Sequence, residues 1–414
     1  MITKEKYNFK LPYLYLVVVF FLTMWGARFL IPGSLPASEI LGVLLSFTVC
    51  GAFLLTKQFF LLVFYSIVVF FNYYTGDAYL SDGRLLLDNV VSMLVSLSLS
   101  FYVFRKHDDR LMQLIIYLVY FITIWTAIAT FVIDLTYPEI VREIAYIMNG
   151  KIVDDWTGYI AFFKMGLSDY YSPHAIPILI PPLVLGIKND ELRKYRFQLY
   201  FVLIACFFIM FLSGATGPLL IGIMVLVMSF VVSEGSNRNN IIRTTIAFLL
   251  FSPFIYSDVF FLGLLSWIDG LIGNGSIFHD KIDDFQRLLI SGNFSGDIEM
   301  RNDLYSETID GIKENILIGS DKAFGGHSAL LDRFSSMGLV GIVPLFLIFF
   351  FQAKFVLRFI SRKARIYYYL GIIAAILELT IKGVTCWSIW FYFFAVLPIS
   401  VYLFEKKRQI IRKS

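Results

Sequence analysis

Residues 337–357 read MGLVGIVPLFLIFFFQAKFVL, an apolar run in which Lys354 is the one charged side chain. A run of this length can cross the hydrocarbon core of a bilayer as one helix, because each helical residue advances about 1.5 Å. Comparable apolar blocks of about 17–22 residues recur along the whole chain. Backbone groups inside a bilayer must pair within their own segment, since no water is available to them. The sequence therefore predicts an all-α polytopic membrane protein.

The composition of the whole chain supports this fold class. Hydrophobic residues make up 58% of the 414 residues, charged residues make up 16%, and the mean hydropathy is +0.74. A soluble domain of this length carries more charge and fewer apolar runs. The blocks also lack the short alternating pattern of an outer-membrane barrel. Cys50, Cys206 and Cys386 fall inside apolar blocks without metal-ligand spacing, which indicates buried apolar side chains and predicts neither a metal site nor a disulfide.

The order of apolar blocks and basic connections predicts about twelve transmembrane helices. Lysine and arginine gather in alternate connections, such as 105–110, 188–196 and 362–365, and in the C-terminal tail. Cytoplasmic loops are enriched in these residues, so both termini are expected to be cytoplasmic. The sixth block contains three prolines and is expected to be bent or only partly membrane-crossing. The predicted spans are 11–31, 38–56, 58–74, 86–104, 111–133, 174–187, 197–212, 218–233, 244–262, 337–357, 366–383 and 386–404.

The blocks divide the chain into three regions. Residues 1–262 form an N-terminal transmembrane bundle of about nine spans, interrupted by a polar loop at about 134–173. Residues 263–336 form a large polar loop that contains short helices and faces away from the cytoplasm. Residues 337–414 supply three further spans and a basic cytoplasmic tail. Loops as long as the second one are uncommon without a function, so we expect the chemistry there.

The second loop contains a helical pattern followed by glycine breaks. Apolar residues recur at helical spacing after Arg301, which predicts a short amphipathic helix that opens at this residue. Gly319 and the Gly325–Gly326 pair are expected to end that helix. Ser328 is a candidate N-cap for a helix that continues into the next span. His327 would then lie at the start of this helix, at the membrane surface.

This arrangement suits transfer of a group away from a diphosphate. A helix N-terminus disfavours imidazolium, so His327 should be biased towards the neutral form that accepts a proton. Backbone N–H groups beside Gly326 would attract an anion, and Arg301 and Arg287 could hold a diphosphate through forked hydrogen bonds. A structural role remains open for these residues, because loop arginines commonly pair with acids such as Asp303. No cofactor or metal is predicted.

Ionisable residues inside the predicted spans are few. Asp88 and Glu378 are the clearest, and an intramembrane acid is a functional candidate by default. Helix packing explains them equally well, because no chain of acids suited to a proton-coupled pump accompanies them. His174 opens the proline-rich sixth block and is a further candidate for substrate binding.

The chain resembles the Wzy-type O-antigen polymerases and their relatives, the O-antigen ligases, at particular residues of the second loop. Arg301 precedes an Asn-Ile-Leu-Ile-Gly step at 315–319, Gly-His-Ser with Leu and Asp follows at 326–332, and a Gly-x-x-Gly pair lies at 338–341. The span arrangement covers most of the chain, whereas the motif covers about 301–341. Many relatives carry an arginine at the outer end of a middle span, where this chain reads Ser-Gly-Ala-Thr-Gly at 213–217.

The resemblance implies a metal-independent glycosyltransferase with a GT-C-like helical fold. It would move a growing glycan from undecaprenyl diphosphate to a hydroxyl of the next lipid-linked unit. By this analogy His327 is the general base or the residue that orients the acceptor, Arg301 binds the diphosphate, and Gly326 and Ser328 belong to the same substrate site. Either Arg287 or Arg84, at the outer mouth of the fourth span, takes the place of the missing arginine, or the diphosphate is bound differently.

The resemblance also implies a location and partners. It predicts a multi-pass protein of the bacterial inner membrane, with the undecaprenyl-diphosphate-linked oligosaccharide as donor and acceptor and with the large loop in the periplasm. A chain-length-regulating membrane protein is a candidate partner, and no nucleic acid is expected. Two alternatives remain open: an O-antigen ligase with a lipid A-core acceptor, and a flippase or transporter of lipid-linked oligosaccharide.

Overall fold

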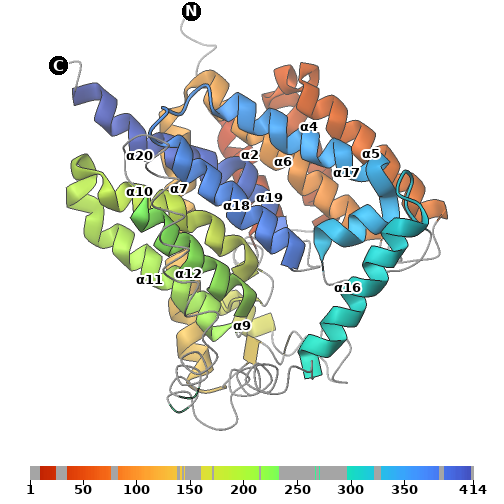
Figure 1. Cartoon of the computed structure of the whole chain (residues 1–414). Helices are drawn as coiled ribbons and strands as arrows, with labels where there is room; N and C mark the ends of the chain where they lie inside the picture. The colour runs from red at the N-terminus through yellow and green to blue at the C-terminus, as the bar shows by residue number, and fades with distance from the viewer. Residues whose placement is uncertain are drawn as a thin grey trace, which may run out of the picture.

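A computed structural model shows a bundle of helices (Figure 1). The part of the chain that it describes is almost entirely helical and contains no strand. The structure describes residues 10–24, 35–75, 83–137, 140, 141, 144, 160–169, 172–213, 216–232, 266, 270, 296–320, 328–381 and 387–411.

The helices follow one another through short connections. Most are α-helical, η1, η3 and η4 are 3₁₀-helices, and η5 is a π-helix. In chain order they are α2 (Lys10–Thr23), α4 (Leu35–Val49), η1 (Gly51–Leu55), α5 (Lys57–Thr75), α6 (Gly83–Lys106), α7 (Asp109–Asp134), α9 (Ile160–Met165), η3 (Ser172–Leu179), α10 (Ile180–Lys188), η4 (Asp190–Tyr195), α11 (Arg196–Leu212), α12 (Thr216–Val231), α16 (Gly296–Glu314), α17 (Ala329–Val356), α18 (Arg365–Ile381), α19 (Trp387–Phe391), η5 (Tyr392–Val396) and α20 (Leu397–Ile411).

Length and hydropathy identify membrane-embedded helices in this bundle. In the described part, four helical stretches are long and apolar enough to cross a membrane: Asp109–Asp134, Asp190–Leu212, Ala329–Val356 and Ser388–Glu405. Five shorter apolar helices accompany them. A helix coincides with every predicted span except 244–262, which lies outside the described residues. The helical, membrane-embedded class is thus confirmed, whereas the number of spans stays a prediction.

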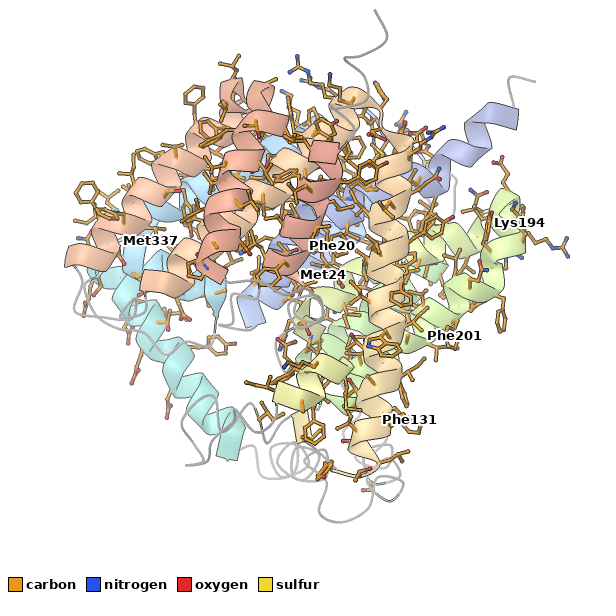
Figure 2. The ribbon with its side chains drawn as sticks, turned by 180° about the vertical axis from the view of Figure 1, so that it is seen from behind. Phe20, Met24, Phe131, Lys194, Phe201 and Met337 are labelled. Carbon is orange, nitrogen blue, oxygen red and sulfur yellow. The ribbon has the colours of Figure 1, made fainter. Side chains whose placement is uncertain are left out.

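Large apolar side chains cover the outside of the bundle as well as its core. Phe197 is 82% exposed, and Ile204 and Phe121 are 63% and 60% exposed. Figure 2 shows Phe201 and Phe131 on the same outer surface of the helices. A soluble protein rarely exposes so much contiguous apolar surface, whereas lipid tails cover such a surface without cost.

The C-terminal helices α18, α19 and α20 join two groups of helices. One group consists of α2, α4, α5, α6 and α17, in which α17 packs along α5. The other consists of α7, α10, α11 and α12. Between them, α18 contacts α17 on one side and α12 on the other, while α19 contacts α6 and α20 contacts α10 (Figure 1). The C-terminal segment is therefore the centre of the fold.

The basic connections meet at one end of the bundle. The ring of Phe104, at the end of α6, lies 5.1 Å from that of Phe359 and 5.5 Å from that of Tyr402. The Asn189 side chain, after α10, donates a hydrogen bond to the Phe404 carbonyl in α20. The connections that the charge pattern assigned to one side of the membrane are thus neighbours in space. Which side of the membrane they face stays a prediction.

The opposite end of the bundle gathers polar contacts between helices distant in sequence. It contains the start of α6, the end of α5, the start of α17, the end of α18 and the start of α19, and α16 extends away from it (Figure 1). We call it the polar end. Three hydrogen-bonded pairs define it: Asn72 with Ser336, Asn89 with Trp390, and His174 with Glu378.

The proline-rich segment is a helix of two kinds, which confirms that it is irregular. Residues Ser172–Leu179 form the 3₁₀-helix η3, and Pro181 and Pro182 then occupy the first turn of α10, where the missing N–H groups cost nothing. A 3₁₀-helix rises about 2.0 Å per residue against about 1.5 Å in an α-helix. The two parts together therefore extend about 30 Å, close to the thickness of a hydrocarbon core.

Candidate functional site

The start of α17 is tied to α16 by a capping network. The Ser328 hydroxyl accepts a hydrogen bond from the Leu331 N–H at 3.2 Å, which confirms the predicted N-cap. The Ser328 N–H in turn donates to Asp332 Oδ2 at 3.1 Å. The Thr308 hydroxyl of α16 reaches Asp332 Oδ1 at 3.4 Å. All three side chains are at least 97% buried, so the network fixes the end of the polar loop against the bundle.

A second contact between these elements is made by backbone alone. Residue 338 is a glycine with φ 57° and ψ −159°, and it kinks α17. Because the helix is interrupted there, the N–H groups of Leu339 and Val340 turn to the carbonyls of Ile316 and Leu317, at 2.9 and 3.1 Å. We call this contact between 315–320 and 335–340 the clasp.

The carbonyl groups released by the kink also find partners. In an uninterrupted helix the carbonyls of Ser335 and Ser336 would accept from the N–H groups of residues 339 and 340. Here Ser320 N–H donates to the Ser335 carbonyl at 2.7 Å, and the Asn72 amide of α5 donates to the Ser336 carbonyl at 2.5 Å. The carbonyls of Ser335 and Ser336 are thus both satisfied.

The clasp gives the motif residues a physical role. The Asn-Ile-Leu-Ile-Gly step occupies its first segment, and the Gly-x-x-Gly pair begins in its second. A Cβ atom at Gly338 would lie 2.4 Å from the Leu317 carbonyl oxygen, and one at Gly319 would lie 2.3 Å from backbone atoms of Ser336. Glycine is therefore required at both positions, because two backbones meet there.

The outer surface of this turn is apolar. The side chains of Ile316, Leu317 and Ile318 are 52%, 61% and 65% exposed, although they belong to a polar loop. Their position at the polar end of the bundle suits contact with the boundary of the bilayer.

Arg333 is a buried cation one turn into α17. Its side chain is 6% exposed, and its guanidinium carbon lies 5.5 Å from the centre of the Trp390 ring. Trp390 is fully buried and donates from Nε1 to Asn89 Oδ1 at 2.9 Å. The contact therefore joins α17, α19 and α6 at the polar end.

His174 and Glu378 form a buried pair in another part of the same end. The Nδ1 atom of His174, in η3, lies 2.7 Å from Oε2 of Glu378, in α18, and the two side chains are 4% and 1% exposed. An intramembrane acid is thus held by a histidine 204 positions away in the sequence. The pair lies where the 3₁₀-helix η3 packs against α18. Because both side chains are buried and ionisable, the pair is a functional candidate.

A small cavity is lined by residues of η3 and of the segment before it, and by hydroxyl groups of α7 and α19–η5. Its volume is about 40 Å³, which holds a small number of water molecules and no sugar ring. Its polar lining consists of Thr123, Thr126, Ser168, Ser172, Ser388 and Tyr392.

The structure describes part of the predicted site. His327, Gly326 and Arg287 lie outside the described residues. Arg301 lies in α16 and Arg84 in the first turn of α6, and their side chains are outside the description. Ser328 and His174 are both buried at the polar end, as cap and as partner of Glu378 respectively.

One local prediction was wrong. The helix that was expected to open at Arg301 begins at Gly296 and ends at Glu314, before Gly319. Asp297 and Glu299 follow its first residue, and acids of this kind favour the first turn of a helix.

Arg333 lacked a motif that could distinguish it from other loop arginines. Its distinguishing property is burial, which follows from the early start of α17 at Ala329. Its burial could have been predicted from its position one turn after the Ser328 N-cap, on a helix that enters the bundle.

No family model matches this chain, and neither a curated protein nor a solved structure matches it.

Proposed function

We propose that this chain is a glycosyltransferase that polymerises lipid-linked oligosaccharide units into a surface polysaccharide. The observation that carries the proposal is the double attachment of the polar loop to the bundle. The Ser328–Asp332–Thr308 network and the clasp hold α16 and the start of α17 together at the polar end. These are the segments to which the motif assigns the chemistry.

The proposed reaction divides its work between two positions of this loop. A hydroxyl of the acceptor attacks the anomeric carbon of the donor glycan, and the bond from that carbon to the diphosphate oxygen breaks. The diphosphate leaves with the bonding electron pair, and Arg301 stabilises its charge. His327 takes the proton of the attacking hydroxyl. His327 is one peptide bond from Ser328, whose N–H and hydroxyl are both fixed by the cap.

Rigid attachment matters for this kind of catalysis. A base and a guanidinium accelerate the transfer only when the donor and acceptor meet them in one geometry. In the clasp the N–H groups of Leu339, Val340 and Ser320 donate to backbone carbonyls of the facing segment, so this anchor consists of main-chain hydrogen bonds. The burial of Thr308 and Asp332 adds a second, side-chain anchor.

The test is glycan chain length in cells that carry single substitutions. We expect His327→Ala and Arg301→Ala to abolish long chains at normal protein level. Lys313→Ala is the matched control, because Lys313 lies on the same helix, is 70% exposed and pairs with Asp310 at 2.8 Å on the surface. Near-normal chain length in both the His327 and Arg301 variants would refute the proposal. Retention of lipid A-core capped with single units indicates a polymerase, whereas loss of all capping indicates the ligase.

A transporter of lipid-linked oligosaccharide is a second candidate, favoured by the His174–Glu378 pair beside a 3₁₀ segment. Broken helices and buried ionisable groups mark the substrate sites of many transporters. The two functions differ in where repeat units accumulate when Glu378→Gln impairs the protein. Membrane-impermeant labelling of glycan in spheroplasts would reveal units on the outer face for a polymerase and none there for a transporter.

A further inference from the structure

The guanidinium of Arg333 is buried and forms no ion pair in the described part of the chain. Its Nη1 atom is enclosed and makes no hydrogen bond, and no ion pair to Arg333 occurs among these residues. The neighbouring Asp332 attracts this charge, but its two carboxylate oxygens bond to the Ser328 N–H and the Thr308 hydroxyl and not to the guanidinium. The Nη1 group of Arg333 is thus open to a further partner.

The surroundings of Arg333 hold the cation in place without neutralising it. The Trp390 ring faces the guanidinium at 5.5 Å, and a ring face attracts a cation but carries no net charge. The ring is fixed by its hydrogen bond to Asn89 and by stacking on Phe394, with 6.0 Å between ring centroids. Because the ring is fixed on both sides, it holds the guanidinium in one place.

A buried arginine cannot relieve its burial by losing a proton. Charges inside membrane proteins occur mainly where they pair with another charge or meet a substrate. The planar fork of a guanidinium binds two oxygens of a phosphate at once. Arg333 also lies at the polar end, against Trp390, and one turn after Ser328 it is close in the chain to the loop that carries the motif.

We propose that Arg333, backed by Trp390, binds the phosphate of a prenyl-diphosphate-linked substrate. The identity of the anion rests on the proposed function, whereas the presence of an anion site rests on the buried guanidinium. Arg333 would then fill the role that the sequence left open between Arg287 and Arg84. Bilayer phospholipids and free phosphate share the same chemistry, so the experiment must separate them.

The experiment measures binding to the purified full chain in nanodiscs, with labelled farnesyl diphosphate as the probe. Phosphatidylglycerol and inorganic phosphate are the competing probes. We expect Arg333→Gln to weaken farnesyl diphosphate binding at least about tenfold, because a hydrogen bond to a charged group is lost. Arg333→Lys keeps the charge but not the fork, so its loss should be smaller. Arg358→Gln is the matched control, since Arg358 is exposed just after the other end of α17.

Three results would overturn the inference. One is a farnesyl diphosphate affinity for Arg333→Gln within about twofold of the parent, the range also expected for the control. The others are equal dependence on Arg333 for phosphatidylglycerol or for inorganic phosphate, which would indicate a general anion site. If Arg333→Gln does not fold, Asn89→Leu provides the second variant. It removes the partner of Trp390 at a distance from the charge and should weaken binding less than Arg333→Lys does.

The binding assay separates this inference from the proposed function. Normal polymer from the His327 and Arg301 variants, together with Arg333-dependent binding, would refute the polymerase and support the anion site. Loss of polymer in those variants, together with unchanged farnesyl diphosphate binding by Arg333→Gln, would support the polymerase and refute the anion site.

Discussion

The substitution Gly338→Ala tests the clasp directly. A Cβ atom at this position would lie 2.4 Å from the Leu317 carbonyl oxygen and 2.5 Å from the Gly319 nitrogen. Both are backbone atoms, so neither can rotate away. The conformation itself, with φ 57° and ψ −159°, is one that only glycine adopts readily. The segment 315–320 must therefore move away from α17.

The expected cost follows from these contacts. Backbone strain of a side chain in such a conformation costs about 1–3 kcal/mol. Displacement of the segment 315–320 also breaks the hydrogen bonds from the N–H groups of Leu339 and Val340. Each contributes about 0.5–1.5 kcal/mol to stability. We therefore expect Gly338→Ala to destabilise the clasp by about 2–6 kcal/mol.

Opening of the clasp can be measured through Ser320, which is 7% exposed and donates its N–H to the Ser335 carbonyl. A cysteine at position 320, in a background without the three native cysteines, should react slowly with a maleimide while the clasp is closed. When closing is faster than labelling, a loss of 2 kcal/mol raises the reaction rate about 30-fold.

The control is Gly217→Ala, where an added Cβ meets no atom within 4 Å. Its labelling rate at position 320 should match that of the parent. A rate for Gly338→Ala within about threefold of the parent would show that the two backbones do not constrain each other, and the reasoning would be refuted.

Three further tests concern the other contacts at the polar end. Ser328→Ala should cost about 1 kcal/mol of stability by removing the cap, measured by denaturant titration in detergent, and an unchanged midpoint would contradict this. Asn72→Ala should cost about 1–3 kcal/mol, because it leaves the buried Ser336 carbonyl without its donor, and equal loss in a variant of the exposed Gln113 would argue against that cause. His174→Ala and Glu378→Gln should each destabilise the protein, and the double variant should lose less stability than the sum of the two single losses. A loss in the double variant equal to that sum would show that the pair is not coupled.

Features set by local sequence were predictable. Apolar blocks identified the helices, the prolines at 177, 181 and 182 marked the irregular span, and Ser328 marked the start of α17. Each of these follows from the chemistry of a few adjacent residues: membrane solubility, a missing N–H group or a capping hydroxyl.

Features that depend on distant partners were not predictable. The glycine at 338 could be read as a break, but the carbonyls at 316 and 317 that fill it come from another segment. The pairing of His174 with Glu378 joins residues 204 positions apart, and hydropathy carries no signal for it. The burial of Arg333 depends on the packing of α17 against α19, which composition alone does not reveal.

The 3₁₀ form of η3 has a consequence for the position of His174. A 3₁₀-helix turns about 120° per residue and an α-helix about 100°, so the two forms drift out of phase by about 20° at each step. Over the eight residues of η3, conversion to an α-helix would shorten the segment by about 4 Å and rotate its far end by about 160°. His174 meets Glu378 in the 3₁₀ form, so a change in the winding of this segment would change the geometry of the pair.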